Sequence, residues 1–179
     1  MTEPFAEMLT GGHPNSLGRT EQVVGIVVDD RNRLDELFAC LDSPDELVRM
    51  RAGDGLEKVC RERQEWFVPW ADRFLAEFGR IDQPSVKWHT AQILDHLRAD
   101  LTDQQRQQAN DLLIHYLDES DDWIVLNTSA GILTRWAGPD PKLARSLRPR
   151  LECLTNDRRK SVARCATKSL ESLNWLEHQ

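Results

Sequence analysis

The stretch "PSVKWHTAQILDHL", residues 84–97, carries the pattern from which the architecture follows. Val86, Thr90, Leu94 and Leu97 recur at offsets of 0, 4, 8 and 11 residues, which places them on one face of a helix with 3.6 residues per turn. The small Thr90 allows a neighbouring helix to approach closely. The stretch therefore predicts a helix that packs against other helices through this column.

The same column recurs three more times along the chain. In each copy a Val is followed by a small residue, a Leu and a bulky apolar residue at the same offsets, and successive valines are 38, 39 and 37 residues apart. Self-similarity at such a period is the signature of a helical repeat array. The other three columns are Val48/Ala52/Leu56/Val59, Val125/Ser129/Leu133/Trp136 and Val162/Ala166/Leu170/Leu173.

A second helix is expected before each column, because another apolar stripe ends 7 or 8 residues upstream of each Val. Thr102 with Gln105 predicts a capping box, and Asp140 followed by Pro141 predicts a capped helix start. The β-rich "VVGIVV" (23–28) is interpreted as a short helix capped by Thr20. We expect a flexible arm over 1–19 and one domain over 20–179, with helix pairs at about 30–62, 66–99, 102–137 and 140–176.

The residues "DELVRMRAGDGL" (45–56) have the D-x-x-V-R-x-x-A-x-x-x-L character of HEAT repeats, and the chain resembles this armadillo-like family over roughly residues 30–175. The resemblance implies an all-α fold: a right-handed α-α superhelix, or solenoid, of about four HEAT-like helix pairs with an N-terminal cap. The pattern weakens in two copies, where the motif Asp is replaced by Gln83 and Arg159. The motif Arg is likewise replaced by Leu126 and Ala163 in the last two copies.

Composition limits the classes of function. Among the 179 residues no apolar run approaches the roughly 20 residues that cross a bilayer, and the N-terminus lacks the pattern of a secretory signal. We therefore expect a cytoplasmic protein. The four cysteines show no C-x-x-C spacing, which predicts reduced thiols and no zinc site.

The sequence predicts no catalytic residue, no metal ligand set and no cofactor, and hence no enzyme. His89 and His96 fall on the same side of the helix but about 10 Å apart along its axis, so they cannot share one metal ion. No Gly-x-Ser-x-Gly or phosphate-binding loop occurs. Some HEAT-like proteins are di-iron hydroxylases built on His-Glu dipeptides, and this chain has no His-Glu.

Candidate contact residues lie in a row next to the columns. Trp88, two residues after Val86, points about 200° away from the buried stripe, and in HEAT-type stacks the second helices line the concave surface. Trp and Arg often anchor protein contacts. Alternatively, Trp88 packs onto an adjacent helix and fills a gap between repeats. The row comprises Met50, Asp54, Trp88, Gln92, Asn127, Arg164 and Lys168. Trp66, Trp70, Trp123, Trp136 and Trp175 are expected to pack at helix ends and seams.

The charge distribution suggests the kind of partner. Net charge is −7, yet residues 142–168 hold nine bases against two acids. We expect a non-catalytic adaptor that binds another protein on its concave helices, with this basic segment steering an acidic partner; a solvated surface is the alternative. A second hypothesis is a nucleic-acid binding protein that resembles HEAT-like alkylpurine DNA glycosylases, with Trp88, Asp54 and Arg164 in the groove. The pI near 5.3 argues against it.

Overall fold

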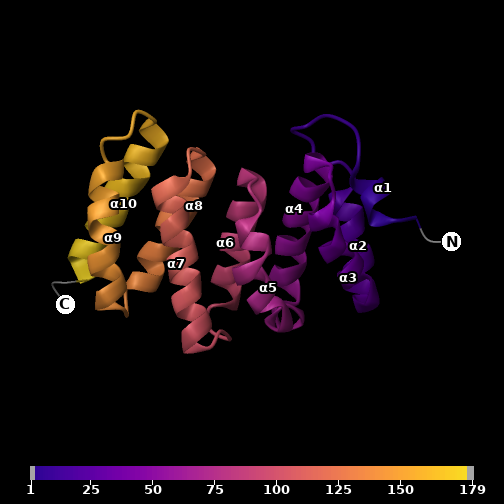
Figure 1. Ribbon diagram of the computed structural model, residues 1–179, viewed down its shortest axis with the longest axis horizontal. Coiled ribbons are helices and arrows are strands. Elements are labelled where there is room, and N and C mark those ends of the chain that lie inside the picture. The colour runs from indigo at the N-terminus through magenta and orange to yellow at the C-terminus, as the bar shows by residue number, and fades with distance from the viewer. Residues whose placement is uncertain (1–2, 177–179) are drawn as a thin grey trace. The chain divides into compact units, whose positions relative to one another are not determined.

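The computed structural model describes residues 3–176, with side chains as far as Asn174. This part of the chain is 78% helical, contains no strand and comprises ten α-helices, several of them joined by 3₁₀ turns (Figure 1). The all-α prediction is confirmed. Within the described residues, no helix combines the length and the apolar composition needed to cross a membrane.

The chain forms two compact units, where the sequence predicts one domain. The N-terminal unit runs to Leu101 and the C-terminal unit begins at Thr102. The boundary falls in the short link between two of the expected helix pairs. Each unit has its own buried columns, and each is described by itself.

The N-terminal unit contains six α-helices. The longest begins after Asp45, whose carboxylate accepts a hydrogen bond from the Leu47 amide at 2.8 Å, and the sixth begins with Pro84, which needs no amide donor in the first turn. Their bounds are α1 Phe5–Leu9, α2 Thr20–Asp29, α3 Leu34–Ala39, α4 Glu46–Glu62, α5 Ala71–Ala76 and α6 Pro84–Leu97.

The core of this unit is built on α4, which lies between α2 and α6 (Figure 1). All eight residues of the first two columns are buried, as the sequence predicts. The unit also contains a cluster of aromatic rings. In this cluster Phe38 stacks on Trp70 with ring centroids 3.7 Å apart. Burying each such side chain contributes about 1.5–3 kcal/mol. The other rings of the cluster are Phe67, Phe74 and Phe78.

Two glycines set the distance between α4 and its neighbours. A Cβ atom at Gly53 would lie 3.3 Å from Cδ2 of His89 on α6, and one at Gly55 would lie 3.4 Å from Cγ2 of Thr20 on α2. Glycine costs helix stability, by up to about 1 kcal/mol relative to Ala. Here it allows close packing of the neighbouring helices on both sides.

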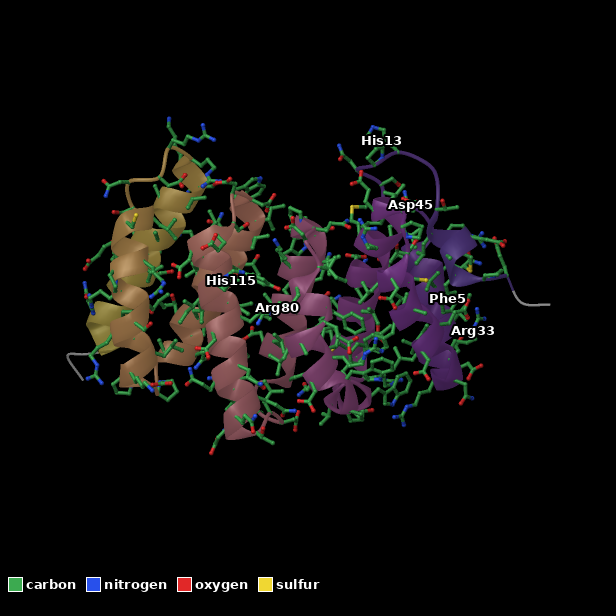
Figure 2. The ribbon with its side chains drawn as sticks, viewed as in Figure 1. Phe5, His13, Arg33, Asp45, Arg80 and His115 are labelled. Atoms are coloured by element: carbon green, nitrogen blue, oxygen red, sulfur yellow. The ribbon has the colours of Figure 1, made fainter. Side chains whose placement is uncertain are left out.

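The N-terminal segment is packed against the unit, where the sequence predicts a flexible arm. Phe5 and Leu9 of α1 have no exposed surface, and the Arg33 guanidinium lies over the Phe5 ring, 4.1 Å from its centroid. Both residues are labelled in Figure 2. Arg51, only 1% exposed, donates hydrogen bonds to backbone carbonyls of the loop that carries His13. Their acceptors are Leu9 (2.6 Å), Gly11 (2.7 Å), His13 (3.4 Å) and Ser16 (2.9 Å).

The short helix predicted for "VVGIVV" is confirmed as α2, but the predicted cap is wrong. Thr20 is the first residue of the helix rather than the residue before it, and its hydroxyl donates to the Leu17 carbonyl at 2.6 Å. The hydroxyl therefore closes the preceding turn and does not accept from the first amides of α2. Thr20 itself is fully buried.

The C-terminal unit contains four long helices. Thr102 and Gln105 form the predicted capping box, with hydrogen bonds of 3.2 and 3.0 Å. Asp140 caps the third helix as predicted, accepting from two amides at 3.0 Å. The bounds are α7 Asp103–Glu119, α8 Trp123–Ala137, α9 Pro141–Leu154 and α10 Lys160–Leu176.

The columns on α8 and α10 form the core of this unit, with one exception. Seven of their eight residues are buried, including Trp136 at 5% exposure, whereas Leu170 is half-buried. The assignment of Trp123 to packing is wrong, because half of this residue is exposed. Trp66 and Trp70 in the N-terminal unit are half-buried, and the Trp175 side chain lies outside the described residues.

Candidate functional site

The predicted row falls into two sets, one in each unit. In the N-terminal unit, Met50 and Asp54 lie on α4 and Trp88 and Gln92 lie on α6, which pack side by side. All four are half-buried. The Trp88 ring lies 5.5 Å from the ring of its neighbour His89, tilted by 55°. Trp88 is thus neither a core residue nor a fully exposed anchor.

A network of polar side chains, among them Asp54 of this row, connects α4 to α2 and to α6. Lys58 forms an ion pair with Asp54 at 2.8 Å and a second one with Glu21 of α2. His96 on α6 contacts Glu57 on α4 at 2.9 Å between Nε2 and Oε1. Asp54 and Glu57 therefore already have partners within the unit.

His89 lies in an enclosed position beside this network. It is 9% exposed, and neither its Nδ1 nor the nearby Gln92 Oε1 has a hydrogen-bond partner with suitable geometry. Burial lowers the pKa of His89, and the negative charges of Asp54 and Glu57 oppose this shift only in part. The imidazole is consequently neutral near pH 7. The sequence excluded a metal ion shared by His89 and His96 but did not show the network around His89, which depends on pairing between helices that periodicity does not specify.

The network does not form a metal centre or a nucleophilic site. No group of three or more His, Cys, Asp or Glu residues in the described part of the chain is arranged to hold a metal ion. All four cysteines are free thiols. Burial raises the pKa of Cys60 to about 12 and that of Cys40 to about 11. These two thiols are therefore protonated and unreactive at neutral pH.

In the C-terminal unit the predicted row lies on two adjacent helices. Asn127 on α8 is half-buried, and its carbonyl accepts a hydrogen bond from Cys165 Sγ of α10 at 3.7 Å. Arg164 precedes Cys165, so it lies close to Asn127. Arg164 and Lys168 are exposed, one turn apart on α10, and neither forms an ion pair with any described residue.

Trp123 belongs to the same surface, and the sequence analysis missed it. It lies one turn before Asn127 on α8, as Lys160 lies one turn before Arg164 on α10, and its side chain is 50% exposed. Extending the repeat frame to the position two residues before each Val would have found both residues. We name this surface the α8/α10 face: Trp123, Asn127, Lys160, Arg164 and Lys168.

Some bases of the segment 142–168 form ion pairs with nearby carboxylates, and others do not. Arg150 forms an ion pair with Asp118 at 2.7 Å, and Arg159 with Asp157 at 2.7 Å. The side-chain hydrogen bond from Arg159 lowers the pKa of Asp157 to about 2. Several other bases of the segment are exposed, and those without an ion pair among the described residues are Lys142, Arg145, Arg158, Lys160, Arg164 and Lys168.

Comparison with known proteins assigns no family. No model of a known protein family matches the chain, and no curated protein matches it significantly.

Proposed function

We propose that the protein is a non-catalytic, HEAT-like α-solenoid adaptor that binds a partner protein on its second helices, α4, α6, α8 and α10. The buried columns support the repeat interpretation, because the same four offsets face the core in every copy apart from Leu170. Neighbouring second helices pack side by side within each unit. Such packing suits stacked repeats, and a right-handed superhelical course is part of the proposal.

The observation that carries the proposal is the composition of the α8/α10 face. It combines a half-exposed Trp with three cationic side chains that form no ion pair with any residue the structure describes. Trp and Arg are typical of residues that dominate binding energy, and cations without an ion pair attract acidic surfaces and accelerate association. We therefore assign an acidic partner protein to this face.

The row in the N-terminal unit plays a lesser part in the proposal. Asp54 is bound to Lys58, and Trp88 is half-buried beside His89. Only part of the surface of each side chain is therefore available to a partner. Trp88→Ala would test this face separately: unchanged affinity would remove the N-terminal row from the binding surface and leave the α8/α10 face in place.

Quantitative affinity purification from the native cell tests the proposal. A specific partner should be recovered with the wild type and should fall on the order of tenfold with Trp123→Ala and with Arg164→Glu. Arg145→Glu is the matched control, because Arg145 is exposed on α9, forms no ion pair within the described part of the chain, and undergoes the same charge reversal. Equal loss with all three variants, or no loss with any, would contradict binding through this face.

Nucleic acid is the second candidate ligand, favoured by the row of Lys160, Arg164 and Lys168. These residues are spaced by one helical turn, about 6 Å, and phosphate contacts need such cations. The glycosylase-like role has less support, because Asp54 is engaged by Lys58. A gel-shift titration at low salt with single- and double-stranded DNA tests this candidate, and the absence of any shift would eliminate it.

A further inference from the structure

A cavity in the C-terminal unit opens between α7 and α9, which also pack against each other. Its volume is about 230 Å³. This is below the roughly 300–1,000 Å³ typical of sites for drug-sized ligands, so an occupant has few heavy atoms. The residues that matter for its chemistry are Asn110, Asp111, Ile114, Asp140, Lys142 and Leu143.

Asn110 is the unusual residue of this lining. It is only 4% exposed, yet its Oδ1 atom is buried without a hydrogen-bond partner. Leaving a buried acceptor unpaired costs about 1–3 kcal/mol. Asn110 therefore favours an occupant that donates a hydrogen bond, because no lining residue donates one to its Oδ1 atom.

The two carboxylates in the lining are less enclosed, because Asp111 is exposed and Asp140 is half-buried. Asp111 Oδ1 accepts from Gln107 Nε2 at 2.8 Å, and Asp140 Oδ1 accepts from the amides of Lys142 and Leu143. The second oxygen of each carboxylate accepts no hydrogen bond from a described residue. The lining thus combines the enclosed Asn110 amide with two carboxylates, each of which keeps one oxygen without a donor among the described residues.

The remaining lining limits the charge and shape of an occupant. Lys142 supplies one cation against two carboxylates; its side chain is exposed and forms no ion pair with either of them. Ile114 and Leu143 provide an apolar wall. The α9 N-terminus is closed to an anion, because Asp140 already accepts from its first free amides.

We propose that this cavity binds a primary ammonium group on a short aliphatic chain. The ammonium donates to Asn110 Oδ1 and is balanced by Asp111 and Asp140, while the aliphatic stem packs on Ile114 and Leu143. A free alkylamine and an aliphatic amino acid share this chemistry. In the amino acid, the carboxylate would in addition pair with Lys142. This inference is independent of the proposed adaptor function, because α7 and α9 do not contribute to the α8/α10 face.

The test is a titration of the isotope-labelled protein followed by amide NMR spectra. n-Butylamine should shift the Asn110 side-chain signal saturably, with a dissociation constant near the millimolar range expected for so small a ligand. 1-Butanol, which keeps the stem but lacks the charge, should shift it at least about tenfold more weakly. Comparing these two ligands requires no variant. Equal shifts from both, or no saturable shift from n-butylamine, would overturn the proposal and leave water as the occupant.

Variants then localise the site and distinguish the two sources. Asn110→Leu should abolish the response to n-butylamine, monitored at the Leu143 amide. Asn127→Leu is the matched control, because Asn127 also has a buried, unpartnered Oδ1 but does not line the cavity. A response retained in Asn110→Leu contradicts the site. Norleucine binding more tightly than n-butylamine, with the gain lost in Lys142→Ala, would identify an amino acid; n-butylamine binding at least as tightly would identify a free amine.

Discussion

Replacing Arg51 with Met should loosen the attachment of the N-terminal segment to the rest of its unit. The side chain is 1% exposed and donates four hydrogen bonds to carbonyl oxygens between Leu9 and Ser16. Hydrogen bonds from a charged group contribute about 1.5–3 kcal/mol each. Three of the four carbonyls belong to exposed residues and can bond to water after the substitution, so the contributions do not add in full. We expect a loss of about 3 kcal/mol in the free energy of unfolding.

Urea unfolding followed by circular dichroism measures the total loss, and amide hydrogen exchange identifies where it occurs. Exchange in α1 should accelerate most, because this helix is attached through the loop that Arg51 holds. Arg61→Met on the same helix is the matched control: Arg61 is exposed and has no partner among the described residues, so the change should stay within about 0.5 kcal/mol. A loss below about 1 kcal/mol for Arg51→Met, with unchanged exchange in α1, would refute the reasoning.

Three further outcomes follow from burial. Trp136→Ala should lower the free energy of unfolding by about 3–5 kcal/mol, whereas Trp123→Ala on the same helix should cost about 1 kcal/mol or less; similar losses in urea unfolding would contradict the exposure difference. Because burial lowers the pKa of His89 below its ordinary 6.5, the unfolded chain takes up this proton at higher pH, so acidification from pH 7 to 5 removes stability. His89→Gln should weaken that pH dependence, and an identical dependence in both proteins would count against it. In a brief alkylation analysed by mass spectrometry, exposed Cys153 should react on the order of 100-fold faster than buried Cys60, and comparable rates would show that Cys60 is accessible.

The helices were predictable from the sequence because the signals that form them are local. The repeated columns specify which side of α4, α6, α8 and α10 is buried, and the caps at Thr102 and Asp140 follow from hydrogen bonds within four residues. The cap at Thr20 was misplaced for an equally local reason, because a hydroxyl can bond either to the preceding turn or to the first amides of the following helix.

The contact surface was harder to predict, because exposure depends on which residues cover a side chain from elsewhere in the chain. Trp88 and Trp123 both point away from their columns, yet Trp88 is half-buried beside His89 and Trp123 is half-exposed. The anchored N-terminal segment was missed for a related reason. Its order comes from Arg51 bonding to backbone carbonyls roughly 40 residues away, and no periodic pattern records such bonds.

The glycines of α4 have a consequence for how the sequence can vary. Gly53 and Gly55 are two residues apart, so they face nearly opposite sides of the helix, toward His89 and toward Thr20. A larger side chain at Gly53 would push α6 away and loosen the polar network around His89. One at Gly55 would push α2 away and loosen the packing of the N-terminal segment. In a library selected for folded protein, both positions should tolerate almost no large residues, while the half-buried Met50 on the same helix should accept many. Gly53 and Gly55 therefore limit the substitutions that α4 can accept.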